Sequence, residues 1–195
     1  MFTDKFGLTQ AVLDGRKTIT RRIIHAENIP DDPEYGYAPN IDACCVFNED
    51  DVVAKSQYNL CEVVAIAQSY ETLANSGYLD KMMDGPLSMK KEYAGAGYKN
   101  KMFVKAELMP RHIKITHIRV ERLQDISNED CSNEGIRTWD HNKNPFPPAY
   151  DFINSPQSSY KTPREAFAAL IDKVSGKGTW DSNPMVWIYE FELVD

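Results

Sequence analysis

The sequence predicts a mainly β protein of the α+β class, built as a small antiparallel β-barrel with peripheral helices and long inserted loops. Strand-like segments dominate and do not alternate with helices in a βαβ rhythm, which favours antiparallel pairing. Residues 185–194 alternate regularly, and residues 112–123 are strand-like but change parity midway. The 195 residues are enough for one domain with a sizeable core, so we expect a single domain over residues 1–195.

The first part of the chain begins with a short predicted helix at 9–15, in which Thr9 caps the start and Gly15 ends the helix. Residues 28–40 are rich in proline and acidic residues and are predicted to be loop. The remaining elements predicted here are a short strand at 44–47, a strand with both faces buried at 62–68, a helix at 71–83 and a glycine-bearing turn at 94–97.

The predicted strand at 112–123 breaks the two-residue period of a strand. Two isoleucines before residues 116–117 share one face, whereas Ile118 and Val120 share the other. A regular strand cannot bury both pairs on one side of a sheet. We therefore expect a bulge or bend near residues 116–117, of the kind that turns the corner of a small barrel.

The last part of the chain has the strongest helix signals. Ser127 caps a predicted helix at 127–136, and residues 137–161 form a long loop that carries several aromatic residues. Thr162 and Pro163 start a second helix, which ends at Gly176. Its core-facing residues are expected to be Phe167, Leu170, Ile171 and Val174, and the strand at 185–194 is expected to bury one face along its whole length.

Composition and charge exclude several classes of protein. The formal net charge of -7 argues against broad nonspecific binding of nucleic acid, although a local basic face remains compatible with it. No apolar run approaches the roughly 18 to 20 residues that span a bilayer, and residues 1–10 lack the pattern of a signal peptide. We expect a cytoplasmic protein that does not bind membranes.

The cysteines and histidines do not follow a metal-binding pattern. The four cysteines lack a CxxC spacing, and the four histidines form no HExxH motif. We expect reduced thiols, no metal and no cofactor, although a zinc site assembled from scattered ligands stays open. Cys131 is either a buried structural thiol or a nucleophile.

The stretch GRKTITRR at residues 15–22 concentrates positive charge in an acidic chain. Like charges this close repel, so the stretch requires an explanation. One interpretation is a solvated basic turn after a helix, where the helix dipole favours cations. The other is a site for an anion or a polar substrate. The cations are Arg16, Lys17, Arg21 and Arg22, and the hydroxyls are those of Thr18 and Thr20.

This stretch resembles the Gly-x-Lys-x-x-Glu-x-Arg signature of the ASCH domain, a branch of the PUA-like superfamily. Gly15, Lys17 and Arg22 fit the signature, and Thr20 stands where many members have Glu. The small bacterial members that resemble N4-acetylcytidine amidohydrolases also have Thr there. The later stretches IRVERLQDISNEDCSNEGI and WIYEF are similar to longer, often phage-associated members. Relative to the small hydrolases, the insertions lie near 28–55, 71–100 and 138–160.

The resemblance implies three catalytic residues, Lys17, Thr20 and Glu134. In the hypothesis that follows, the Thr20 hydroxyl attacks an amide, Lys17 is its base and Glu134 is an acid/base partner. The lysine can serve as a base only if its pKa falls by about 3 units from about 10.4. These three side chains must then converge on one cleft. Substrate or RNA binding is assigned to Arg16, Arg21 and Arg22.

The resemblance leaves more than one function open, because a fold does not fix a function. One class is an amidohydrolase that removes an N4-acyl group from a modified cytidine. The second is a noncatalytic module that binds single-stranded RNA through the same basic cleft. A third is a phage-derived accessory protein that recognises modified bases in DNA. The expected partner is therefore a modified nucleoside or single-stranded RNA.

Overall fold

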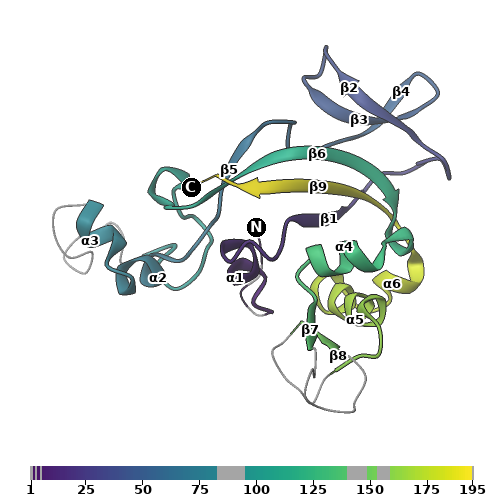
Figure 1. Cartoon of the computed structure of the whole chain (residues 1–195). Coiled ribbons are helices and arrows are strands. Elements are labelled where there is room, and N and C mark those ends of the chain that lie inside the picture. The colour runs from purple at the N-terminus through teal and green to yellow at the C-terminus, as the bar shows by residue number, and fades with distance from the viewer. Residues whose placement is uncertain are drawn as a thin grey trace. The chain divides into compact units, whose positions relative to one another are not determined.

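The computed structural model of the chain describes residues 2, 4, 6–82, 95–139, 149–152 and 159–194. Antiparallel sheets dominate, the largest of them curls like part of a barrel, and short helices complete the fold (Figure 1). The predicted fold class is therefore confirmed. The chain divides into a larger unit of residues 3–62 and 114–192 and a smaller unit of residues 1–2, 63–113 and 193–195. The single-domain organisation stays a prediction.

Most elements belong to the larger unit. In chain order they are α1 (Leu8–Leu13), β1 (Ile19–Ile23), β2 (Glu34–Ala38), β3 (Ala43–Asn48), β4 (Asp51–Lys55), nearly all of β6 (His112–Arg122), a 3₁₀ turn (Leu123–Asp125), α4 (Asn128–Asn133), β7 (Arg137–Trp139), β8 (Ala149–Asp151), α5 (Pro163–Ser175), α6 (Thr179–Ser182) and nearly all of β9 (Met185–Leu193). The smaller unit holds β5 (Val63–Ala65), α2 (Tyr70–Asn75), α3 (Tyr78–Met82) and a 3₁₀ turn (Ala106–Leu108).

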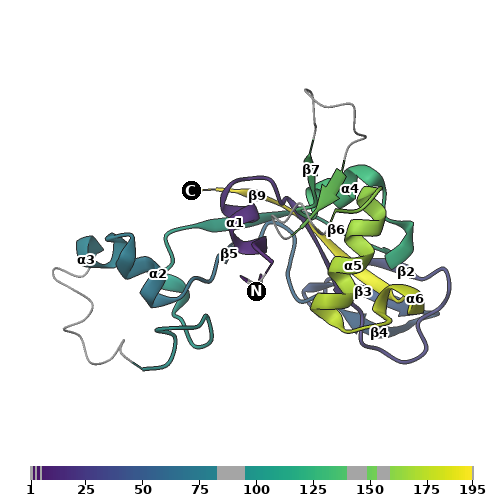
Figure 2. The ribbon, with the colours of Figure 1, turned by 90° about the horizontal axis from the view of Figure 1, so that it is seen from below.

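The largest sheet has the order β1-β9-β6-β5, and β9 is its most buried strand. Every residue from Met185 to Tyr189 is buried, whereas Glu190 is half-buried and Glu192 is exposed. The prediction that one face of this strand is wet only at one end is confirmed. Within the larger unit, the β2-β3-β4 sheet lies on one side of β1 and β9, and helices α4 and α5 lie side by side on the other (Figures 1 and 2).

Strand β6 contains an irregularity of the kind that its parity predicts, and the position of that irregularity near residues 116–117 stays a prediction. The carbonyl of His112 accepts from Val194 N at 3.1 Å near one end, and Leu123 N donates to Pro184 O at 2.9 Å near the other. The β6 segment between these bonds is one residue longer than the facing segment of β9, as a bulge in β6 requires. The strand also curves visibly along its length (Figure 1).

Two helices begin where their caps predict. The Thr162 hydroxyl accepts from Glu165 N at 3.1 Å, and the Ser127 hydroxyl accepts from Asp130 N at 3.0 Å. Helix α5 then runs to Ser175, and Gly176 follows as expected. One core assignment is wrong, because Val174 is 42% exposed near the helix end. Helix α4 is also shorter than predicted, since it stops at Asn133.

Other boundaries differ from the predictions for local reasons. Helix α1 starts at Leu8 after a left-handed Gly7, so Thr9 is a buried helix residue and not the cap. Residues 34–38 form β2 despite the prolines around them, because β3 offers a paired edge. The strand predicted at 62–68 is only β5, and Val63 is 57% exposed, so its two faces are not both buried.

The smaller unit has a core of its own. The predicted helix at 71–83 is split into α2 and α3, because a left-handed Gly77 separates them; residue 83 lies outside the described residues. Gly97 also has a positive φ, and its carbonyl accepts from Tyr70 N at 3.0 Å. The described part of the glycine-bearing turn therefore packs against α2 as a structural turn. The buried residues of this core are Tyr70, Leu73, Leu79, Leu108 and Met109.

All four cysteines are free thiols, as predicted. Among the described residues, no helix combines the length and the apolar character that crossing a lipid bilayer requires.

Candidate functional site

The basic stretch folds into strand β1, and the strand sorts its side chains onto two faces. Successive side chains of a strand point to opposite sides of the sheet. Arg21 therefore faces one side, and its neighbours Thr20 and Arg22 face the other. Thr20 is paired with Tyr189, and Arg22 is paired with Trp187, so these side chains share a face with two aromatic residues of β9.

Arg21 lies on the side that helices α4 and α5 cover, and its side chain is only 1% exposed. Its guanidinium donates to Glu121 Oε1 at 2.6 Å, to Asp130 Oδ2 at 2.7 Å and to Glu134 Oε1 at 3.3 Å. The guanidinium carbon also lies 5.9 Å from the ring centre of Phe167 on α5. Arg21 thus connects β1 to β6 and to both helices.

Arg119 of β6 extends this network toward solvent. Its guanidinium pairs with Glu121 on the same strand, donates to Asp130 Oδ2 at 2.8 Å and donates to Glu190 Oε1 at 3.2 Å. Each of Glu121 and Asp130 therefore receives hydrogen bonds from two arginines. We call the following residues the ion-pair cluster: Lys17, Arg21, Arg119, Glu121, Asp130 and Glu134.

Lys17 is buried as well, with 2% of the residue exposed. Its Nζ donates to Ile19 O at 2.7 Å, to Glu134 O at 3.0 Å and to a carboxylate oxygen of Glu134. An ammonium group has three donors, and all three are matched by acceptors. The two residues are 117 positions apart in the sequence, so the contact joins the first motif to the end of α4.

Gly135 allows this close approach. It follows Glu134, the C-cap residue of α4, and has a φ of +102°. Glycine adopts this conformation without the steric cost of a Cβ atom. A Cβ there would lie at ordinary contact distances, 3.5 Å from both Ala11 and Leu8 of α1 and 3.7 Å from Lys17 Cβ, so it is the positive φ that favours glycine. The chain can therefore turn directly beneath α1 and bring Glu134 onto Lys17.

Burial and charge act against each other in the cluster. Burial lowers the pKa of Lys17 below its ordinary value, and the carboxylate of Glu134 partly opposes that effect. Burial disfavours the charged form of Asp130 as well, but hydrogen bonds from Arg21 and Arg119 outweigh it and lower the pKa of the Asp130 carboxyl group. Asp130 is therefore held ionised in the folded protein.

The other face of β1 borders a cavity of ≈ 320 Å³. Three side chains that can carry positive charge line it: Arg22, His25 and Lys55 of β4. Two buried aromatic residues of β9, Trp187 and Tyr189, line it as well. The cavity thus has basic groups and two aromatic side chains in its lining, and it lies on the face of β1 that carries Thr20. We call it the Arg22 cavity.

The predicted catalytic residues are brought together only in part. Lys17 and Glu134 form a buried pair. Thr20 is also buried, and it directly follows Ile19, whose carbonyl accepts from Lys17. Its side chain, however, alternates with Arg21 and belongs to the opposite face of the strand.

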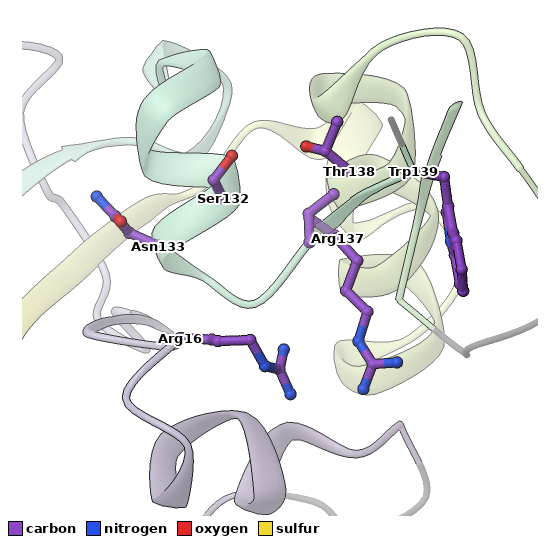
Figure 3. A pocket seen from close by; sticks show the side chains of 7 residues that line it. Arg16, Ser132, Asn133, Arg137, Thr138 and Trp139 are labelled. Atoms are coloured by element: carbon purple, nitrogen blue, oxygen red, sulfur yellow. The ribbon is translucent and has the colours of Figure 1, made fainter. Parts of the chain in front are cut away.

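The predicted binding arginines occupy three different places. Arg21 is inside the ion-pair cluster, and Arg22 lines the Arg22 cavity. Arg16 lines a separate cavity of ≈ 550 Å³, together with Arg137 and Trp139 (Figure 3). The three arginines of one short stretch therefore serve three different surroundings.

Sequence reasoning missed several residues of these sites. The alternation of β9 placed Trp187 and Tyr189 on one face, but without the pairing of β1 and β9 nothing linked that face to Arg22. Asp130 was recognised only as part of a helix start. A buried Arg21 requires carboxylates around it, and that requirement was the available signal for Glu121 and Asp130.

Cys131 does not have the properties of a nucleophile. Its thiol is buried within α4, and burial raises its pKa to about 12. A reactive thiol needs a lowered pKa, because the thiolate is the attacking species. The structural interpretation of Cys131 is therefore favoured.

Among the described residues, no group of three or more His, Cys, Asp or Glu side chains is arranged to hold a metal ion. Comparison of the chain with known proteins gave no matching family model, no matching curated protein sequence and no matching solved structure.

Proposed function

We propose that this protein recognises a nucleoside, either free or within single-stranded RNA, in the Arg22 cavity. The observation that carries the proposal is the lining of this cavity, in which Arg22, His25 and Lys55 occur together with Trp187 and Tyr189. Nucleobases offer a flat π face and several hydrogen-bond acceptors, and RNA adds phosphates. Aromatic and basic side chains in one groove are the usual means of binding such groups.

The size of the cavity is consistent with a ligand of this class. Its volume of ≈ 320 Å³ falls at the lower end of the roughly 300 to 1,000 Å³ that small-molecule pockets have. The Tyr189 hydroxyl accepts from Gln57 N at 2.9 Å, a bond that joins two residues of the lining. Arg22 donates to the carbonyl of its neighbour Arg21 at 3.2 Å, which orients the guanidinium at the cavity wall.

We further propose that the chain is a member of the ASCH branch of the PUA-like superfamily. The proposal rests on the GRKTITRR stretch, whose Lys17 contacts the Glu134 that the resemblance pairs with it. The curled antiparallel sheet is compatible with a barrel of that kind.

Binding is tested by titrating the purified protein with cytidine, N4-acetylcytidine and a short single-stranded RNA. Arg22→Gln and Lys55→Gln are expected to weaken binding about tenfold each, as the loss of a charged hydrogen bond does. Lys177→Gln removes an exposed charge away from the cavity and is the matched control. RNA affinity should fall with salt, with a logarithmic slope near −0.7 per phosphate contacted. Equal binding by all variants would reject the Arg22 cavity as the site.

A second candidate function is hydrolysis of an N4-acyl group, and the Lys17–Glu134 pair favours it. In this reaction the Thr20 hydroxyl attacks the acyl carbonyl and gives its proton to the pair. Because the Thr20 side chain belongs to the opposite face of β1, this transfer requires Thr20 or the pair to move from its place in the structure. The N4 amino group of the cytosine takes up a proton and leaves as the amine. Water then hydrolyses the acyl ester on Thr20 and releases the acyl group. Burial lowers the pKa of Lys17, which is the direction that a general base requires.

Hydrolysis is tested by measuring the release of cytidine from N4-acetylcytidine. Thr20→Val removes the hydroxyl while keeping the shape of the side chain, so the fold should be retained. Thr18→Val is the matched control, two residues earlier in the same stretch. The reaction should disappear in Thr20→Val and persist in Thr18→Val. Equal rates in the wild type and in Thr20→Val would exclude Thr20 as the nucleophile.

A further inference from the structure

The Arg22 cavity does not account for Arg16, the first cation of the basic stretch. Arg16, which follows α1, lines the cavity of ≈ 550 Å³ together with residues from the end of α4 and from strand β7 (Figure 3). Its other lining residues come from a separate part of the sequence: Ser132, Asn133, Ile136, Arg137, Thr138 and Trp139. This cavity shares no lining residue with the Arg22 cavity, so the two are separate sites.

Two guanidinium groups approach this cavity from different elements. Arg16 follows α1 and Arg137 begins β7, and both side chains extend toward the same space (Figure 3). Both guanidinium charges act on the carboxyl group of Asp14. A hydrogen bond from Gln10 lowers the pKa of Asp14, and the charges of Arg16 and Arg137 lower it further. The 3.0 Å ion pair between Arg16 and Asp14 is exposed at the surface, so an anionic ligand can compete for the guanidinium with little desolvation.

The remaining lining has the chemistry that complements a nucleotide. The half-buried Trp139 supplies an aromatic surface next to Arg137. Ser132 and Asn133, at the end of α4, are two further polar residues of the lining. Guanidinium groups bind the oxygens of phosphate in a bidentate manner. The face of a tryptophan ring can stack against any of the four bases.

We propose that this cavity binds the phosphate of a nucleotide between Arg16 and Arg137, with the base packed against Trp139. The phosphate belongs either to a free nucleotide or to a single-stranded RNA, and the chemistry of recognition is the same for both. The site goes beyond the proposed function, because a nucleoside in the Arg22 cavity needs no phosphate group.

The test compares cytidine 5′-monophosphate, cytidine and a short cytidine oligonucleotide as ligands. It is made in the Arg22→Gln protein, so that phosphate contacts in the Arg22 cavity are weakened in advance. The monophosphate should bind at least tenfold more tightly than cytidine, and inorganic phosphate should compete with it. Arg16→Gln and Arg137→Gln should each remove about tenfold of this affinity, whereas Lys177→Gln should leave it unchanged.

The outcomes separate the two ligand sources and the two proposals. Binding of both the monophosphate and the oligonucleotide, with sensitivity to Arg137→Gln, supports a site for any nucleotide. Binding of the oligonucleotide alone, with the same sensitivity, supports a site for the RNA backbone. Phosphate-dependent binding that is insensitive to both Arg16→Gln and Arg137→Gln, or its absence, overturns the inference. Cytidine binding by the wild type, with sensitivity to Arg22→Gln, would then leave the proposed function standing.

Discussion

Arg21 and Arg22 are chemically identical neighbours, but the two faces of β1 give them opposite roles. Arg21 is buried among Glu121, Asp130 and Glu134, where its charge is neutralised within the fold. Arg22 lines a cavity whose other polar residues are mainly basic or neutral. The difference shows that charge density in a sequence does not by itself mark a binding site. The alternation of the strand decides which cation holds the structure together and which one lines a cavity.

The two faces of β1 also differ in whether their residues contribute to the stability of the fold or to binding. A buried ion pair adds little net stability by itself, since desolvation offsets much of the attraction, but removal of one partner leaves an uncompensated charge. Substitutions in the ion-pair cluster should therefore act mainly on stability. Substitutions around the Arg22 cavity should act mainly on binding.

The largest effect is expected from Glu134→Gln. The change leaves Lys17 buried without its carboxylate, so the free energy of unfolding should fall by about 3 to 5 kcal/mol. Urea denaturation followed by circular dichroism measures it. The double variant Lys17→Met with Glu134→Gln should be more stable than Glu134→Gln alone, because no buried charge is then unpaired. Glu129→Gln, exposed on the same helix, is the control.

A smaller effect is expected from Asp130→Asn, which weakens two charged hydrogen bonds from Arg21 and Arg119. The expected loss is about 1.5 to 3 kcal/mol at neutral pH. The pKa of Asp130 is lowered in the folded protein, so the carboxylate stabilises the fold above about pH 4, the ordinary pKa of Asp. That stability is lost as the pH falls through the lowered folded-state pKa.

The difference in unfolding free energy between the wild type and Asp130→Asn should therefore shrink on acidification below about pH 4. Urea denaturation at several pH values measures it. Asp125→Asn, an exposed aspartate on the preceding turn, should show little effect at any pH. A difference that is independent of pH would contradict the role given to the Asp130 carboxylate.

The smallest effect is expected from Gly135→Ala. Its neighbours lie at ordinary contact distances, so the cost comes from the positive φ and should be about 1 to 2 kcal/mol. Gly36→Ala is the control, because Gly36 lies in β2 with open space around it and has no positive φ. In thermal unfolding, Gly135→Ala should melt at a lower temperature than Gly36→Ala. If the two variants melted at the same temperature, the turn after Glu134 would not need glycine.

Elements with complete local signals could be predicted from the sequence. Thr162 and Pro163 define the start of α5, and the alternation from Met185 defines β9, because caps and periodicity act over a few residues. The boundary of α1 was misplaced, because a left-handed Gly7 leaves no side-chain signal at the cap. Strand β2 was missed, because its stability depends on pairing with β3 rather than on its own composition.

Of the candidate site, only the contact between distant segments that the ASCH resemblance implies was predictable from the sequence. The Lys17–Glu134 contact was expected from the ASCH resemblance, and local patterns alone do not connect residues so far apart. The two roles of Arg21 and Arg22 follow from the register of β1, which the sequence did not reveal. Arg16 and Arg137 line the same cavity because of how the end of α1, the end of α4 and strand β7 pack together. Local sequence patterns do not predict that packing.

The most direct test of the division between the two faces is the affinity of the Arg22→Gln protein for a short cytidine-containing RNA. The measurement is made in a protein whose Arg137 is already replaced by Gln, so that the second cavity contributes little. We predict binding about tenfold weaker than with Arg22 in place, at an unchanged free energy of unfolding. Unchanged affinity, or a loss of affinity that accompanies unfolding, would contradict it.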